Sequence, residues 1–245
     1  MRQSGSQGAQ LLTWMRENSE LNWMPERLLK PLARDIAHDR HFDRFFRMVK
    51  DMRSGIKPDK AAYMRLVLDV ATQSRLQVPE NGLVLFSGAE GASARAAVLR
   101  NDKLYTNHRT PATAMLELLN TFGKSTTPLE TTEERYLPWR LLSVRLVQQA
   151  KGDVRAYVKN AAPDRTFRQY ELAPLIDNPA VTAINGKPKA EWVPQITGRP
   201  NVRRMIAQGQ QVIIDHMASQ GDVTTVTAVA GKPPPRTREN RWRSA

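Results

Sequence analysis

The stretch of sequence that decides the fold is GLVLFSG, residues 82–88. Its apolar run is typical of a short buried strand, and the Ser87-Gly88 pair after it indicates a tight turn. The small residues from 89 to 99 then favour a helix. Parallel strands need a crossover connection, which is usually a helix, so this strand–turn–helix unit predicts a parallel sheet covered by helices.

The chain after this unit alternates between extended and helical patterns. Extended segments are expected at residues 104–106, 154–158, 167–172 and 224–229. Helices are expected at residues 110–120, 138–150 and 202–219. The first of these begins with Thr110 and Pro111, a good N-cap and first-turn pair. A loop is expected at residues 126–134, and a second one, rich in proline and glycine, after residue 172.

The chain before this unit has the spacing of amphipathic helices instead. Four such segments are expected, at residues 9–18, 25–36, 42–52 and 58–77. We therefore predict an α/β (α+β) fold with a helical N-terminal subdomain (1–78). A second domain (79–230) follows, with a small, mostly parallel sheet flanked by helices. Residues 231–245 are basic and proline-rich, and they are expected to form a flexible tail.

The net charge of the 245-residue chain is +13, from 37 basic and 24 acidic residues. Such an excess favours anionic partners, which include nucleic acid, phosphate-bearing ligands and an acidic protein. The absence of cysteine excludes disulfides, thiolate metal sites and a cysteine nucleophile. The four histidines form no recognisable ligand motif, so no metal is expected.

No apolar run approaches the length of a membrane span, and the polar N-terminus has no signal-peptide pattern. We therefore expect a cytoplasmic protein, or one that is secreted into a target cell by a route independent of a signal peptide.

Three local features carry the chemistry. They are Leu85-Phe86-Ser87-Gly88 at a strand end, Trp139 and Ser143 one helical turn apart, and Glu171 at the end of an extended segment. Each also has a structural interpretation: Ser87-Gly88 as a plain turn, Trp139 as a core residue, and Glu171 as a surface carboxylate.

In this order the features resemble the ADP-ribosyl cyclase / NAD glycohydrolase family, and in particular its bacterial toxin-type members. That family has an apolar–aromatic–Ser strand end, a Thr-x-Glu-x-Thr segment, a helical Trp followed four residues later by Ser, and a Thr-Phe-x-x-x-Glu motif. The similar stretches here are Leu85-Phe86-Ser87, Thr106 to Thr110, Trp139 with Ser143, and Thr166-Phe167 with Glu171. The resemblance covers residues 82–175.

The resemblance implies that NAD is the substrate and that no separate cofactor is needed. It implies catalytic roles for Glu171, Trp139 and His108. A carboxylate such as Glu171 stabilises the oxocarbenium-like centre that forms when the nicotinamide–ribose bond breaks. An indole such as Trp139 attracts the flat nicotinamide cation. The implied substrate-binding residues are Phe86, Ser87, Gly88, Ser143, Arg109 and Thr166.

Two positions depart from the family pattern. Phe86 stands where the family usually has tryptophan, and His108 stands where it usually has an acid. Because that acid is tied to the balance between cyclisation and hydrolysis, we predict hydrolysis to ADP-ribose and nicotinamide with little cyclic product. The lack of cysteine suits a bacterial relative that acts in the cytosol.

The predicted function is therefore an NAD glycohydrolase, as an antibacterial toxin or effector domain with an acidic immunity protein as partner. A nucleic-acid-directed toxin such as an RNase is the main alternative, supported by the net charge and the arginines between residues 236 and 243. A non-catalytic binding protein is the second alternative. Loss of NAD in a permissive cell would favour the NAD glycohydrolase over both alternatives.

Overall fold

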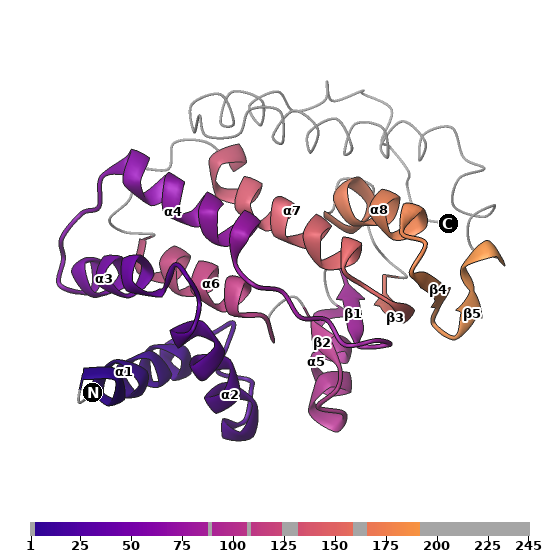
Figure 1. Ribbon diagram of the computed structural model, residues 1–245, viewed down its shortest axis with the longest axis horizontal. Coiled ribbons are helices and arrows are strands. Elements are labelled where there is room, and N and C mark those ends of the chain that lie inside the picture. Colours follow the sequence, from indigo (N-terminus) through magenta and orange to yellow (C-terminus); the bar gives the residue numbers. More distant parts are fainter. Residues whose placement is uncertain (1–2, 88–89, 107–108, 124–131, 159–165, 192–245) are drawn as a thin grey trace, which may run out of the picture.

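A computed structural model describes residues 3–87, 90–106, 109–123, 132–158 and 166–191. The predicted fold class is confirmed: a five-stranded, mostly parallel sheet is flanked by helices and preceded by a helical N-terminal third (Figure 1). The segments predicted at 202–219 and 224–229, and the tail 231–245, lie outside the described residues.

The four predicted N-terminal helices are present. They are α1 (Gln3–Glu17), α2 (Glu26–Ala37), α3 (Phe42–Arg53) and α4 (Lys60–Gln73). Pro25 directly precedes α2, and the Asp59 carboxylate caps α4 by accepting a hydrogen bond from the Ala62 N–H at 2.9 Å. The apolar positions that repeat every three to four residues in α3 are buried, as their spacing predicts.

These helices pack against two later ones, α6 (Pro111–Gly123) and α7 (Thr132–Gln148). α3 lies on α6 and α4 lies on α7 (Figure 1). The result is one continuous apolar core that runs from Leu11 in α1 to Leu146 in α7. The domain boundaries near residues 78 and 230 stay a prediction.

The sheet has the order β2-β1-β3-β4-β5. Its strands are β1 (Leu83–Phe86), β2 (Tyr105–Thr106), β3 (Gly152–Tyr157), β4 (Val181–Ile184) and β5 (Lys187–Pro188). The first four are parallel and β5 is antiparallel to β4. Alternate residues of β1 are buried in two different cores. Val84 lies in the larger core together with α5 (Gly91–Arg100). Leu83 and Leu85 lie in a second core, under α7 and α8 (Leu172–Asp177).

This strand order contains a topological switch point. From β1 the chain crosses through α5 to β2 on one side, and then through α6 and α7 to β3 on the other side. Open α/β sheets bind ligands outside the carboxyl ends of their strands at such a point. Here it lies between β1 and β3, whose ends are joined by a hydrogen bond from the Ser87 N–H to the Tyr157 carbonyl at 3.1 Å.

The prediction of an extended segment at 167–172 is wrong. Residues Phe167–Glu171 form a π-helical turn, η3, that leads directly into α8. Phe167, Tyr170 and Glu171 are buried at helical spacing, and η3 packs on α7. Packing against α7 therefore overrides the strand preference of Phe and Tyr, which depends strongly on context.

Two further expectations are corrected. α7 begins at Thr132 rather than at Pro138, so the residues from 132 that were expected in a loop are helical and Pro138 lies inside the helix. The expected loop after residue 172 contains α8 and the hairpin β4–β5. A two-residue turn, Asn185-Gly186, joins these strands with φ of 53° and 72°. Asn-Gly is a strong hairpin signal because both residues tolerate positive φ.

Candidate functional site

The side chains of Ser143 and Glu171 meet in the interior. Ser143 lies on α7 and Glu171 ends η3, and each is only 5% exposed. The Ser143 hydroxyl donates a hydrogen bond to the Glu171 carboxylate. Two residues that the sequence selected separately are thus brought together, and Glu171 is not a surface carboxylate.

The environment of Glu171 favours its neutral form. Burial raises the pKa of the carboxyl to about 7, although the hydrogen bond from Ser143 acts in the opposite direction. A carboxyl with this pKa exchanges its proton near neutral pH. Such perturbed carboxyls are typical of groups that act in catalysis, since ordinary glutamates are fully ionised there.

The backbone that carries Glu171 is itself unusual. π-Helical turns are rare and occur frequently at functional sites. In η3 the buried Phe167 anchors the turn in the second core, while Thr166, directly before it, is exposed and makes no capping hydrogen bond through its side chain. The Thr-Phe-x-x-x-Glu motif therefore has an exposed start, an apolar anchor and a buried acid at its end.

Trp139 lies one turn before Ser143 on α7. Residues four apart on a helix share a face, so the indole is on the side of α7 that carries Ser143. Trp139 is partly buried against the larger core. The structure thus puts the predicted indole within one helical turn of the serine that holds the acid.

Phe86 and Ser87 end β1 at the switch point. Phe86 is in register with Tyr157 of β3, and its ring lies so close to Gly91 that a Cβ there would be 3.2 Å from Phe86 Cε2. Glycine at position 91 therefore allows the first turn of α5 to approach the strand end. Phe86 lies on the α5 side of the sheet, and no described contact joins it to Glu171.

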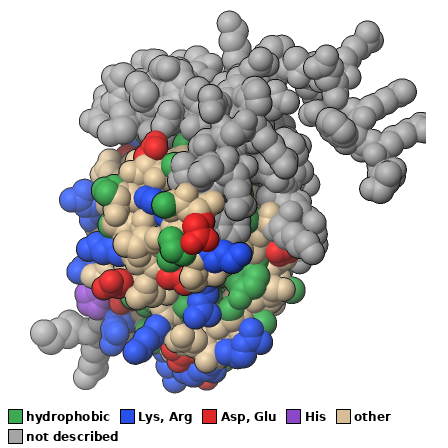
Figure 2. Space-filling model, turned by 90° about the vertical axis from the view of Figure 1, so that its right-hand side faces the viewer, with side chains coloured by type: hydrophobic (Ala, Val, Ile, Leu, Met, Phe, Trp, Pro, Cys, Tyr) green, Lys and Arg blue, Asp and Glu red, His purple; other side chains and the backbone are tan. Residues whose placement is uncertain are grey.

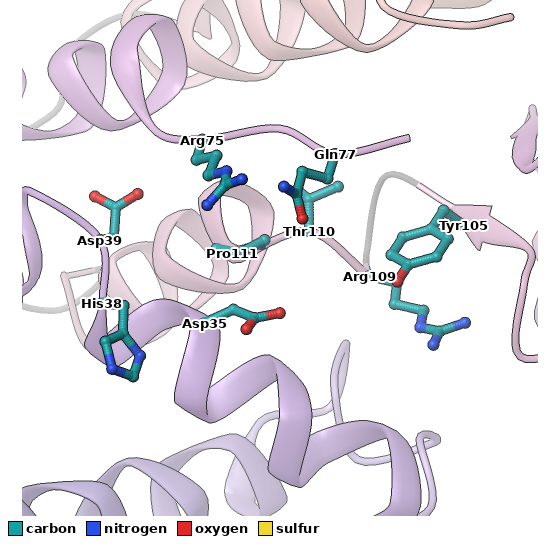
Figure 3. A pocket seen from close by; sticks show the side chains of 9 residues that line it. All are labelled: Asp35, His38, Asp39, Arg75, Gln77, Tyr105, Arg109, Thr110 and Pro111. Atoms are coloured by element: carbon teal, nitrogen blue, oxygen red, sulfur yellow. The ribbon is translucent and has the colours of Figure 1, made fainter. Parts of the chain in front are cut away.

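Arg109 lies elsewhere. Its guanidinium donates to the backbone carbonyls of Asp102 at 2.6 Å and Leu104 at 2.8 Å, and it covers the Tyr105 ring. It lines an open pocket between α2, the segment after α4 and the start of α6 (Figure 3). That pocket contains none of Trp139, Ser143 and Glu171. His108 and Gly88 lie outside the described residues.

Sequence reasoning missed one residue beside the acid. Arg140 lies on α7 with its Cζ 4.8 Å from the centre of the Tyr170 ring, and Tyr170 directly precedes Glu171. The available signal was spacing, since residues 136, 139, 140 and 143 repeat every three to four residues and therefore share one face of the helix.

Within the described ranges, no three His, Asp or Glu side chains are grouped so that they could hold a metal ion. No helix in those ranges combines the length and apolar character that a membrane crossing requires. Figure 2 shows that, on the face that it presents, Lys and Arg side chains are interspersed with acidic ones and do not form one continuous basic surface.

No protein-family model matches the sequence, and no curated protein shows significant similarity to it. Among solved structures, the chain is similar to an ADP-ribosyl cyclase complexed with N1-cIDPR (17% identity, TM-score 0.37, 62% of this chain and 76% of that one). It is also similar to the Aplysia cyclase complexed with the substrate NGD and the product cGDPR (17% identity, TM-score 0.39, 69% and 82%). Similarities this weak do not establish an activity for this chain.

Proposed function

We propose that this protein is an NAD glycohydrolase that cleaves the nicotinamide–ribose bond of NAD. The observation that carries the proposal is the buried Glu171 carboxyl, which accepts a hydrogen bond from Ser143 one helical turn after Trp139. A carboxylate can stabilise the positive charge that develops on the ribose, and an indole can attract the cationic nicotinamide ring, so these groups suit cleavage of the nicotinamide–ribose bond.

In the proposed reaction, the bond between the ribose C1′ and the nicotinamide nitrogen breaks, and its electron pair leaves with nicotinamide. The positive charge that develops on the ribose is stabilised by ionised Glu171, and this effect is strong because the carboxylate lies where water is excluded. Ser143 keeps the carboxylate in one orientation. Water then adds to C1′ and loses a proton, which gives ADP-ribose.

The other predicted residues extend this site. We propose that Trp139 stacks on nicotinamide and that Phe86 contributes a second apolar wall. The Ser87 hydroxyl, the Gly88 N–H and Thr166 are proposed to contact the ribose and diphosphate, whereas Arg109 lies in a separate pocket and is not assigned to this site. Since His108 replaces the acid of the resembled family, hydrolysis is expected to dominate over cyclisation.

The proposed biological role is that of an antibacterial toxin that depletes NAD and is inhibited by an acidic immunity protein. The net charge of +13 supports an acidic partner. Expression in a bacterium should lower cellular NAD before growth stops. Degradation of RNA without loss of NAD would instead favour a nucleic-acid-directed toxin.

The direct test is incubation of the purified protein with NAD, followed by chromatographic separation of the products. We expect equal amounts of nicotinamide and ADP-ribose, with little cyclic ADP-ribose. Glu171→Gln keeps the shape of the side chain but removes its charge, and it should lower the rate at least about 100-fold.

Glu117→Gln is the matched control. Glu117 is also a buried glutamate, 8% exposed, but it lies in the middle of α6. Its variant should cleave NAD at the parent rate, provided that circular dichroism shows the same fold for both variants. A folded Glu171→Gln protein with the parent rate contradicts the mechanism, and a parent protein that leaves NAD intact contradicts the function.

A further inference from the structure

The Arg140 guanidinium lies over the rings of two tyrosines. Its Cζ lies 4.8 Å from the centre of the Tyr170 ring and 6.0 Å from that of Tyr136. Tyr170 is buried and Tyr136 is 52% exposed, and the Arg140 side chain that contacts both is itself half-buried. Stacking occupies the faces of a guanidinium and leaves the N–H groups at its edge available for hydrogen bonds.

Other partly buried arginines use their own N–H groups in ion pairs or hydrogen bonds. Arg95 pairs with Glu20 at 2.7 Å, Arg53 pairs with Glu17 at 2.6 Å, and Arg145 donates to the Ser74 carbonyl at 2.9 Å. Among the described residues, Arg140 has neither an acidic partner nor a hydrogen-bond acceptor. A half-buried guanidinium that packs on aromatic rings, with no acceptor for its donors among the described residues, is suited to bind an anion.

The position of this guanidinium relates it to the candidate acid. Arg140 lies one helical turn before Ser143, and it stacks on the residue that precedes Glu171. An anion bound to its edge would therefore lie beside the group that we propose to act on the ribose. In a nicotinamide nucleotide, the phosphate attached to the ribose is the anion closest to the bond that is cleaved.

We propose that Arg140 is a specificity-determining residue that binds the phosphates of the substrate and so selects nicotinamide nucleotides over the phosphate-free nucleoside. This inference rests on the proposed function. The planar guanidinium can donate two parallel hydrogen bonds to phosphate oxygens, which a lysine ammonium cannot do.

The kinetic test compares NAD with nicotinamide riboside as substrates. Arg140→Gln should raise KM for NAD about 10- to 100-fold, with little change in kcat, because it removes charge-assisted hydrogen bonds to phosphate. Cleavage of nicotinamide riboside should be unchanged. Arg140→Lys should lie between the parent and Arg140→Gln. Arg65→Gln removes one positive charge from an exposed position on α4 and should match the parent.

A binding test separates this inference from the proposed function. Calorimetric titration with inorganic pyrophosphate should give a dissociation constant at least about 10-fold weaker for Arg140→Gln than for the parent and for Arg65→Gln. Equal binding by all three proteins overturns the role of Arg140 even if NAD is cleaved. Weaker binding only in the Arg140 variants supports it even if NAD is not cleaved. Equal losses with NAD and nicotinamide riboside would reduce Arg140 to a structural residue and also overturn the proposal.

Discussion

Acidic side chains of the helical N-terminal third and of the segment around Glu171 lie in environments that shift their pKa values in opposite directions. Glu26 on α2 is exposed, and the ammonium of Lys30 and the guanidinium of Arg16 lower the pKa of its carboxyl. Glu171 is buried, with the Ser143 hydroxyl as its described partner, and its pKa is raised to about 7. The first region stabilises ionised carboxylates at its surface, whereas the second keeps a carboxyl where ionisation is unfavourable.

This difference separates stability from function. Buried positions of α1 to α4 are filled mainly by apolar residues, whose removal from water stabilises the fold. Burial of an ionised carboxylate reduces stability, and a buried carboxyl with a strongly raised pKa is a candidate for a role in catalysis. Variants in the first region should therefore change the free energy of unfolding, and variants in the second should mainly change catalysis.

The largest effect is expected for Phe45→Ala on α3. Phe45 is fully buried in the larger core, so truncation should lower the free energy of unfolding by about 3–5 kcal/mol, measured by denaturant titration. NAD cleavage per folded molecule should stay at the parent level. A comparable loss of specific activity at a temperature where the variant is folded would show that the two regions are not separable.

The next effect is the pH dependence of kcat/KM for NAD. Because the pKa of Glu171 is about 7 and the reaction needs its ionised form, kcat/KM should fall about tenfold per pH unit below that value. Between pH 8 and pH 5 this amounts to about 100-fold, with a plateau above pH 8. A flat profile from pH 5 to pH 8 would contradict the assignment of Glu171 as the acting carboxylate.

A smaller effect concerns how the free energy of unfolding depends on pH, and its sign is opposite for Glu171 and Glu26. The folded-state pKa of Glu171 is higher than that of the unfolded chain, so its contribution to stability is complete below about pH 4.5 and is lost as the pH rises to about 7. Glu171→Gln removes the charge that causes this loss. It should raise the free energy of unfolding at pH 8 by about 1–3 kcal/mol and leave it unchanged at pH 4.

Glu26→Gln provides the comparison. The pKa of the Glu26 carboxyl is lowered, so the ionised group adds stability above pH 4.5 and its removal should give no gain at pH 8. Thermal unfolding of both variants at pH 4 and pH 8 measures the two signs. A gain at pH 8 for Glu26→Gln as large as that for Glu171→Gln would remove the contrast between the regions.

The same contrast explains how much could be predicted from the sequence. The helices of the N-terminal third follow from apolar spacing and from Pro25 and Pro58, because nothing there competes with ordinary packing. The strands β1 and β3 follow equally well from apolar patterning. Around Glu171 the pattern of Phe, Tyr and alternating polar residues predicts a strand, but contact with α7 imposes a π-helical turn. Such a contact between distant segments is not encoded in local propensity.

For the site, the sequence selected Ser143 and Glu171 and the structure brings them together. The stacked Arg140 escaped notice because its partner Tyr170 is thirty positions away in the printed sequence and the two meet only through the packing of η3 on α7. The strand-end residue Phe86 was expected beside the acid, but it packs against the larger core, as Trp139 does, and no described contact joins it to Glu171.

The smallest effect is expected for Ser143→Ala. Its hydroxyl donates to the carboxylate and so stabilises the ionised form, which means that its loss should raise the pKa of Glu171 further above its ordinary value. A hydrogen bond of this kind contributes on the order of 1 kcal/mol, so the acid limb of the kcat/KM profile should move up by somewhat less than one pH unit. Activity should fall several-fold at pH 7 and return close to the parent value at pH 9.

Ser74→Ala is the matched control, because Ser74 is also a buried serine, at the end of α4, and its hydroxyl has no hydrogen-bond partner among the described residues. It should leave the pH profile unchanged and alter stability little, since no hydrogen bond is lost. If the two alanine variants have the same pH profile, Ser143 does not tune Glu171, and the pair is a packing contact like many others in the core.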